Sequence, residues 1–416
     1  MKFTAALLLS ICTLCAAQPV SATIGDGLHK LRASDGVTDA EFGWSVDLSG
    51  NTAIVGAWQD DDNGFRSGSV YSFDVATGSQ LWKIVPSDGT VNGQFGVSVG
   101  MSGDKVIVGA RFAKNNPVAT GAAYVFDVAT GAELAKLNSI NAAGNDYFGW
   151  AVDISENIAI VSAERDNEHG TSSGAAYLFD VTTGTELFKL TANDAAIADS
   201  FGISVGIDGT KAIVGAYQNR GGSSNFGSAY LFDVATGTQL AKLVPSDPGA
   251  FDWFGWRVGI SGNIAIVSAL RDDDNGTDSG SAYLFDVTTG AQLAKLTPSD
   301  GAEGARFGIS VAISGNMAIV GADGDDENGF GSGAAYLFDV TTGTQLAKLI
   351  AGDGATVDSY GVSVGTDGKR AIVGARLDDD NGFSSGSAYL FSTVPEPSAL
   401  LLAIYGAVGL LAWRRR

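Results

Sequence analysis

The chain has 416 residues, and its 46 acidic side chains against 25 Lys and Arg give a formal net charge of −21 at pH 7. This charge argues against nucleic acid and anionic lipid surfaces as partners, because both require clustered cations. With 57 Gly and only 8 Pro, the composition is typical of short strands joined by tight turns rather than of disorder.

The first 22 residues read as a secretory signal peptide. Lys2 precedes an apolar run over residues 3–17, and small residues follow. Cleavage is expected after Ala17 or Ala22. The chain's two cysteines, Cys12 and Cys15, lie within this segment, so the mature protein is expected to have no disulfide, thiolate metal site or cysteine nucleophile.

Residues 23–393 repeat themselves with a period of 53 residues. The first marker is an aromatic residue followed by Gly, and it occurs at Phe42, Phe95, Phe148, Phe201, Phe254, Phe307 and Tyr360. A second marker is a leucine that keeps the same step: Leu28, Leu81, Leu134, Leu187, Leu240, Leu293 and Leu346. Seven copies of one unit therefore form the body of the protein.

Each copy contains four candidate strands, which in the first copy are residues 42–48, 52–56, 69–73 and 80–84. Four strands in about 50 residues are typical of a propeller blade, with a solenoid as the main alternative. The seventh copy lacks its fourth strand, and residues 28–31 supply that strand in register at the N-terminus. Only a closed ring requires this, so we expect an all-β, seven-bladed propeller of antiparallel four-stranded blades, closed by the N-terminal strand.

Each copy opens its first strand with an aromatic-Gly pair, as at Phe42-Gly43, and closes its second strand with a motif such as Val55-Gly56-Ala57. This combination resembles the FG-GAP repeat, which occurs in integrin α-subunits and in many bacterial surface proteins. The resemblance extends over all seven copies and implies a binding or structural role. Integrin-type repeats often carry a calcium loop between strands one and two. Here a tight turn over residues 49–51 replaces it, so that calcium site does not carry over.

The C-terminal residues 394–416 combine Pro395-Glu396-Pro397, an uncharged stretch over residues 399–413 and a terminal Arg414-Arg415-Arg416. As a helix, that stretch is roughly 22 Å long against a hydrocarbon core of about 30 Å. The three parts together resemble the PEP-CTERM sorting signal. The resemblance implies a short transmembrane helix, transient inner-membrane insertion, an exosortase partner and final release to the surface or matrix of a Gram-negative bacterium. A plain membrane anchor is the alternative.

Catalysis is not expected. His29 and His169 are the only histidines and lie far apart, so neither a zinc site nor a Ser-His-Asp triad can be assembled from the pattern. Paired carboxylates remain an unspecific alternative. The segment 73–83 resembles quinoprotein repeats, but a turn capped by Asp with Gly at positive φ explains it better, and no cofactor is predicted.

The best candidate site is the acidic loop between strands two and three, which is complete in copies one, five, six and seven and broken in copies two to four. Strand alternation places these loops on one face with the four-to-one loops, which are acidic in six copies. The candidate binding residues are Asp60, Asp61, Asp62, Asp272, Asp273, Asp274, Asp325, Asp326, Asp378, Asp379, Asp380 and the nearby aromatic Trp253.

These loops do not complete an EF-type calcium sequence, so no metal residues are assigned. Two alternatives stay open: weak calcium shared between neighbouring loops, and Asn-Gly turns whose acids are solvated. The near-identity of the copies favours a non-catalytic binding or adhesion module for an extracellular polysaccharide or surface protein. A purely structural matrix component is the alternative, and a polysaccharide-processing enzyme is third.

Overall fold

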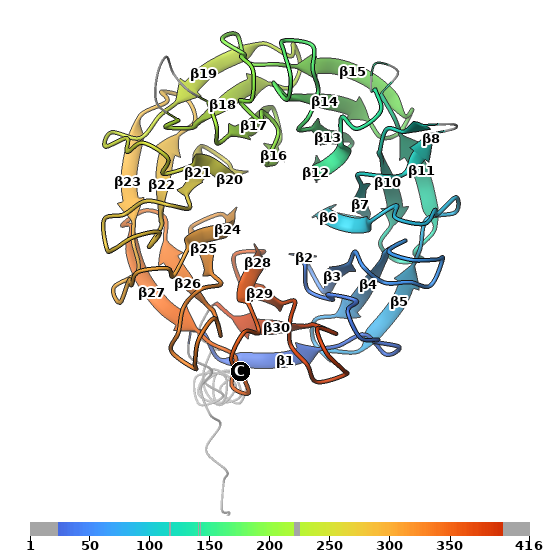
Figure 1. Ribbon diagram of the computed structural model, residues 1–416, viewed down its shortest axis with the longest axis vertical. Coiled ribbons are helices and arrows are strands. Elements are labelled where there is room, and N and C mark those ends of the chain that lie inside the picture. The colour runs from blue at the N-terminus through green and yellow to red at the C-terminus, as the bar shows by residue number, and fades with distance from the viewer. Residues whose placement is uncertain (1–23, 116–117, 140, 142, 220–224, 394–416) are drawn as a thin grey trace, which may run out of the picture.

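The computed structural model describes residues 24–115, 118–139, 141, 143–219 and 225–393, and all regular structure in these residues is β. Seven four-stranded antiparallel sheets stand around a common axis as the blades of a propeller (Figure 1). The predicted fold class is therefore confirmed.

Blade one shows how a repeat folds. From the axis outwards it contains β2 (Ser45–Ser49), β3 (Thr52–Ala57), β4 (Ser69–Asp74) and β5 (Gln80–Ile84). These match the predicted strands except at the start of β2. The sequence predicts a strand from Phe42, but Phe42 instead forms a bridge to Gly386 of blade seven. In blade one the Phe-Gly pair thus joins two blades before strand one begins, whereas in five other blades strand one begins at the aromatic residue itself.

The other blades repeat this order, each listed from its innermost strand outwards. Blade two is β6 (Phe95–Ser102), β7 (Lys105–Ala110), β10 (Ala122–Asp127) and β11 (Glu133–Leu137), with a small hairpin of β8 (Lys114–Asn115) and β9 (Val118–Ala119). Blade three is β12 (Phe148–Ser155), β13 (Ile158–Ala163), β14 (Ala175–Asp180) and β15 (Thr185–Leu190). Blade four is β16 (Val205–Asp208), β17 (Lys211–Ala216), β18 (Ser228–Asp233) and β19 (Gln239–Leu243). Blade five is β20 (Phe254–Ser261), β21 (Ile264–Ala269), β22 (Ser281–Asp286) and β23 (Gln292–Leu296), and blade six is β24 (Phe307–Ser314), β25 (Met317–Ala322), β26 (Ala334–Asp339) and β27 (Thr344–Leu349).

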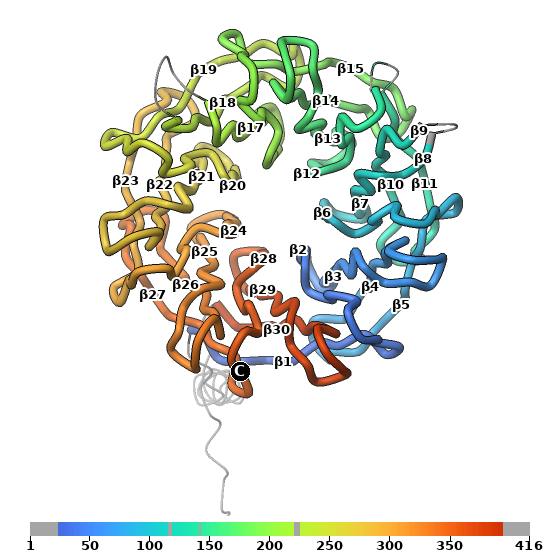
Figure 2. Tube along the Cα trace, in the orientation of Figure 1, coloured from blue at the N-terminus to red at the C-terminus, as the bar shows by residue number. Residues whose placement is uncertain are grey.

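Blade seven is completed by the start of the chain. It contains β28 (Tyr360–Thr366), β29 (Arg370–Ala375) and β30 (Ser387–Ser392), and its outer strand is β1 (Gly27–Leu31). Lys30 pairs with Tyr389 and Leu31 with Ala388 in an antiparallel ladder. The trace in Figure 2 shows the N-terminal strand lying along the outside of the C-terminal blade. The predicted closure is confirmed, and it leaves neither end of the sheet array as an open edge.

The hydrophobic core is divided into seven layers between neighbouring blades. In one layer Phe42 of blade one is 1% exposed and its ring lies edge-on to Tyr71 at 5.4 Å and Phe73 at 5.8 Å, with Leu390 of blade seven in the same cluster. Burying such a side chain contributes about 2 kcal/mol. The aromatic marker in each repeat is therefore a packing residue, and this includes Phe254.

Glycine follows the aromatic marker for a steric reason. Gly43 has a φ of +92°, and a Cβ there would lie 2.3 Å from the carbonyl oxygen of Ser387 in the next blade. Any side chain would force the blades apart, since real Cβ contacts are never this short. The Phe-Gly pair thus supplies the packing ring and the close backbone approach between blades.

Polar side chains on the innermost strands join neighbouring blades. Asp47 accepts a hydrogen bond from the Met101 backbone N–H at 2.7 Å, and Asp153 accepts one from Ile207 at 2.8 Å. Serines in other blades serve the same purpose, as where Ser363 donates to the carbonyl of Gly43 at 2.7 Å. These contacts hold the seven strands that surround the axis.

In the part of the chain that the structure describes, no helix is long and apolar enough to cross a membrane. The predicted signal peptide, the Pro395-Glu396-Pro397 motif and the predicted transmembrane helix lie outside the described residues.

Candidate functional site

The two faces of the ring differ in their loops. Because strands alternate in direction, the two-to-three and four-to-one connections emerge together on one face, here named the loop face, and tight turns form the other, the turn face. Each 3–4 turn is built around an Asp, as where Asp74 accepts hydrogen bonds from the N–H and hydroxyl of Thr77, both at 2.8 Å. All predicted acidic site residues lie in loops of the loop face.

The first acid of each complete loop is buried rather than solvated. Asp60 is 1% exposed, and its carboxylate accepts hydrogen bonds from the Tyr71 hydroxyl at 2.9 Å and from Lys83 Nζ at 3.2 Å. Its other oxygen accepts the Asp62 N–H at 3.0 Å. Asp272, Asp325 and Asp378 are buried in the same way, each against the tyrosine and lysine of its own blade. Solvation, one of the two alternatives at the sequence level, does not describe these four acids.

The second and third acids have their own partners. Asp61 accepts a hydrogen bond from the backbone N–H of Arg66 at 2.6 Å, which shapes the loop. Equivalent bonds at 2.7 to 2.8 Å are made by Asp273, Asp326 and Asp379. The third acid forms an ion pair with the strand-four lysine, as Asp62 does with Lys83 at 2.5 Å. Asp274 and Asp380 pair likewise, and Glu327 takes this role in blade six.

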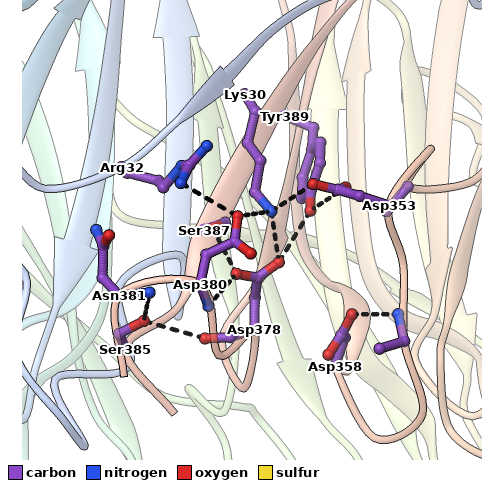
Figure 3. A network of polar contacts seen from close by, with 12 residues as sticks. Lys30, Arg32, Asp353, Asp358, Asp378, Asp380, Asn381, Ser385, Ser387 and Tyr389 are labelled. Atoms are coloured by element: carbon purple, nitrogen blue, oxygen red, sulfur yellow. Dashed lines mark hydrogen bonds and ion pairs between the residues drawn. The ribbon is translucent and has the colours of Figure 1, made fainter. Parts of the chain in front are cut away.

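Blade seven presents the same network across the closure (Figure 3). Lys30 projects from β1, and its Nζ lies 2.8 Å from both Asp353 and Asp378 and 2.5 Å from Asp380. Tyr389 on β30 donates to Asp353 at 2.9 Å and to Asp378 at 3.0 Å. The cation therefore comes from the N-terminal strand and all three anions from the C-terminal blade.

The network persists where the sequence appears to lose the loop. In blade three, Asp166 accepts from Tyr177 at 3.0 Å and pairs with Lys189 at 2.8 Å, so it occupies the place of Asp60. In blade four, Asn219 accepts from Lys242 at 2.9 Å. Blade two keeps Asp88, which pairs with Lys136 at 2.5 Å and accepts a hydrogen bond from Tyr124 at 2.7 Å. These lysines and tyrosines were not singled out in the sequence, although they recur with the 53-residue step.

The network shifts the titration of its members. Burial alone would raise the pKa of Asp35, but hydrogen bonds from Lys83 and Tyr71 lower it below its usual value. Burial would lower the pKa of Lys83, and hydrogen bonds to Asp35 and Asp62 raise it instead. Burial and the charge of Asp60 raise the pKa of Tyr71, so its hydroxyl stays protonated and donates. Asp35 and Lys83 are therefore charged together at neutral pH.

In each complete acidic loop, the ammonium group of a lysine already occupies the space between the carboxylates. Lys83 Nζ lies among Asp35, Asp60 and Asp62 at 2.8, 3.2 and 2.5 Å, where a metal ion would have to bind. Within the described ranges, no group of three or more His, Cys, Asp or Glu side chains is placed to hold a metal. The acidic loops thus act chiefly as internal salt-bridge centres.

A second feature of the loop face is a cavity of about 960 Å³ on the ring axis, lined by the innermost strands of all seven blades. Its loop-face end, here named the axial mouth, is lined by Trp44, Trp150, Trp256, Arg257, Arg306, Asp323 and Arg376. Its turn-face end is lined by Asp47, Asp153, Asp208, Asp367, Lys369 and Arg370. Three guanidinium groups against one carboxylate make the axial mouth locally cationic in a protein whose net charge is −21.

Aromatic and guanidinium groups alternate around the axial mouth. The Trp256 ring stacks on Trp253 at 5.4 Å, and Tyr217 meets both indoles edge-on. Arg271 lies 3.9 Å from the Trp253 ring centre. Trp253, predicted from the sequence as an aromatic beside the acidic face, thus belongs to the surroundings of the mouth rather than to the acidic loops.

Other blades contribute similar pairs. Arg376 lies 5.0 Å from the Trp44 ring centre and forms an ion pair with Glu41 at 3.1 Å. Arg111 lies 4.4 Å from the centre of Trp150. Such cation–π contacts hold planar groups in defined orientations.

Three buried polar atoms at the mouth lack a hydrogen-bond partner among the described residues: Trp256 Nε1, Asp323 Oδ1 and Arg376 Nε. The indole N–H groups of Trp44 and Trp150 donate to the carbonyls of Val97 and Ile203 at 3.1 and 3.0 Å. The buried Trp256 Nε1 has no such acceptor. The neighbouring Arg257 guanidinium contacts the Trp256 ring at 5.1 Å, and burial lowers its pKa to about 10 although the charge of Glu164 favours the cation. Unsatisfied buried donors are uncommon and call for a reason.

The residues of the mouth are also the positions at which the copies differ. The tyrosine and the lysine of the salt-bridge network recur in all seven copies. Three other positions differ from blade to blade: the residue before Phe-Gly, the residue after Phe-Gly and the residue after strand two. The position after Phe-Gly reads Trp44, Val97, Trp150, Ile203, Trp256, Ile309 and Val362, and the one after strand two reads Trp58, Arg111, Glu164, Tyr217, Leu270, Asp323 and Arg376. The position before Phe-Gly reads Glu41, Gln94, Tyr147, Ser200, Trp253, Arg306 and Ser359, all with φ between 51° and 61°. The backbone is constant there and only the side chains vary, a signal that a position-by-position comparison of the copies would have found.

The comparison with known families agrees with this architecture. The family described as FG-GAP repeat matches residues 28–73, 79–126, 132–179, 185–232, 238–285, 291–338 and 344–391. The chain belongs to the FG-GAP repeat family. Each matched unit runs from the fourth strand of one blade to the third strand of the next, so the seven units of this FG-GAP propeller tile the ring without a remainder.

The PEP-CTERM protein-sorting motif matches residues 393–416. It is a signal for exosortase-type processing and points to export and the cell surface, as the sequence predicts. A search of curated proteins finds no match to the chain.

Proposed function

We propose that this FG-GAP propeller is a non-catalytic binding module of the cell surface or extracellular matrix, which engages a glycan or protein at its axial mouth. The observation that carries the proposal is that three equivalent positions around the mouth carry different side chains in different blades, although the backbone before each Phe-Gly pair has the same conformation. A repeat protein that served only as a ring has no need of different side chains at equivalent positions around one opening. The mouth also offers a cavity of about 960 Å³, in the range of small-ligand sites.

The acidic loops support this role indirectly. Their carboxylates are engaged with lysines and tyrosines of the same blade, so the network stiffens the rim around the mouth. Sites held on rigid strands position ligand groups more accurately than sites on free loops. We propose further that weak calcium binding, if present, lies outside the Lys-centred acids and supports the loops rather than the ligand.

A glycan array and a panel of matrix proteins, both probed with the secreted protein, test the proposal. Trp256→Ile, which introduces the residue found at Ile203 and Ile309, is expected to abolish the signal. Trp82→Ala is the matched control, because Trp82 lies on the outer strand β5 and alanine occupies its position in blades two, four, five and six. Equal binding by both variants, or no ligand on either panel, contradicts the proposal.

A structural role in the matrix is the second candidate, and one observation favours it. Phe65, Phe330 and Phe383 are 56%, 77% and 68% exposed in the loops of three consecutive blades, one, six and seven. Exposed aromatics grouped in this way suit self-association. Sedimentation velocity against concentration measures it, and Phe330→Thr, which matches Thr171 and Thr277, should reduce any association. A monomer at all concentrations removes this candidate.

A further inference from the structure

We propose that the ligand of the axial mouth is an acidic polysaccharide, whose uronic acid carboxylate is bound by Arg257 while its sugar rings pack against the indoles that line the mouth. This inference rests on the proposed function and names the chemical class of its ligand. It starts from the single blade that departs from the others at the second position after Phe-Gly.

Arg257 is an exception within the repeat. Its equivalents are Ser45, Ser98, Ala151, Ser204, Ser310 and Ser363, and the serines close hydrogen bonds between innermost strands. Arg257 makes no such bond among the described residues, and its backbone N–H is instead accepted by Ser268 on β21 of the same blade at 3.0 Å, as Ser162 accepts that of Ala151 in blade three. The side chain of Arg257 is thereby freed from joining strands and lines the cavity.

The charges around Arg257 favour an anion. Three guanidinium groups, those of Arg111, Arg165 and Arg257, surround the single carboxylate of Glu164, which is 9% exposed. Arg306 and Arg376 flank Asp323 on the opposite side of the mouth. The Arg257 guanidinium stacks on the Trp256 indole and has no hydrogen-bond acceptor among the described residues. It can therefore bind a carboxylate in the bidentate geometry that guanidinium groups prefer.

The remaining groups favour a sugar over a peptide or a simple anion. Trp44, Trp150 and Trp256 all line the opening, and indole faces pack well on the C–H face of a pyranose. The unpaired Trp256 Nε1 is one donor for a ring hydroxyl or carboxylate oxygen. The turn-face end of the cavity carries four aspartates, Asp47, Asp153, Asp208 and Asp367, against two cations, Lys369 and Arg370, so the mouth is the end of the cavity that favours an acidic chain.

Isothermal titration of the secreted protein with trigalacturonate tests the inference, with maltotriose and triglutamate as neutral and peptide comparisons. We expect trigalacturonate to bind at least about tenfold more tightly than either, and its affinity to fall with added salt. Arg257→Ala, which copies Ala151 beside Ser162 in blade three, should weaken binding by about tenfold or more. Arg257→Lys keeps the positive charge but not the planar pair of guanidinium donors. Its affinity should lie between those of the wild type and Arg257→Ala, which distinguishes a loss of recognition from misfolding.

Arg32→Thr is the control, since it removes one guanidinium from the outer rim, where Arg32 pairs with Asp380 at 3.3 Å. It should leave the affinity unchanged. Maltotriose binding as tightly as trigalacturonate, triglutamate competing equally well, or Arg257→Ala binding like wild type overturns the inference. In those cases a positive glycan or protein array keeps the proposed function, whereas an empty array removes both.

Discussion

Lys30 and Asp378 lie 348 residues apart in the sequence, yet Lys30 Nζ lies 2.8 Å from Asp378 Oδ2. The same lysine and aspartate meet within a continuous blade as Lys83 and Asp60, 23 residues apart. The ring is therefore closed by a backbone ladder and by a salt-bridge centre that other blades assemble locally.

Replacing Lys30 with Met should destabilise the protein strongly. Asp378 is 3% exposed and would lose its counter-ion, and breaking a buried pair from one side costs about 3 kcal/mol or more. Guanidinium chloride unfolding measures the change. Lys136→Met in blade two is the matched control, because its single partner Asp88 is about half exposed and the expected loss is below about 1 kcal/mol. Equal losses for the two variants would show that the closure is not held by this centre.

Stability should fall as the pH rises from about 4 to about 7. Burial beside the axial cavity raises the pKa of Asp47 and Asp153 to about 7, although backbone N–H donors favour the ionised form. An acid whose pKa is higher in the folded state binds its proton more tightly there, so its contribution is complete below about pH 4 and is lost as the pH approaches 7. Access to the cavity keeps the effect smaller than for a fully enclosed acid.

Thermal melting between pH 4 and 8 checks this dependence, and the double variant Asp47→Gly, Asp153→Gly isolates it. Glycine occupies the equivalent position in blades two, four, five and seven. The melting temperature of the variant should no longer fall between pH 4 and 7. It should still fall below pH 4, where carboxylates with lowered pKa such as Asp35 become protonated. A decline that persists in the variant would assign it to other groups.

Calcium should leave the melting temperature of the wild-type protein unchanged, because lysine ammonium groups occupy the centres of the complete acidic loops. Lys295→Met removes one ammonium and leaves Asp247, Asp272 and Asp274 together without a cation. Millimolar calcium should therefore stabilise this variant relative to EDTA and not the wild type. A rise in the wild-type melting temperature would revive the calcium alternative.

The mature secreted protein should end before the terminal arginines. The sorting motif matches residues 393–416, and we expect exosortase-type processing to remove this tail near Pro395-Glu396-Pro397. Intact mass spectrometry of the protein from culture supernatant measures both ends. A secreted form that still ends in Arg416 contradicts processing, and the start of the chain will distinguish cleavage after Ala17 from cleavage after Ala22.

Much of the fold was predictable because the seven copies share one sequence pattern, so the strands assigned in one copy can be transferred to the others. The Phe-Gly spacing locates every blade, and the register of residues 28–31 predicts the closure. The chemistry of the loop face was less predictable. Asp60 looks like a solvated loop acid until strand four places Lys83 beside it, and that contact depends on sheet geometry rather than on spacing.

The axial mouth was hidden for a different reason. Trp44, Trp150 and Trp256 belong to blades one, three and five, and only the closed ring brings them to one opening. These tryptophans are recognised as candidate site residues because other copies carry different residues at the same position. A search for repeats looks only for residues that the copies share. Arg257 stands where serine or alanine is the rule, and this departure is visible in the sequence once positions are compared one by one.

The most direct test is a crystal structure of the secreted protein soaked with trigalacturonate. We predict a sugar on the ring axis at the loop face, with its carboxylate paired to the Arg257 guanidinium and its ring packed against the indoles that line the mouth. Trigalacturonate bound instead at the acidic rim or on the turn face, with the axial mouth empty, would contradict the account.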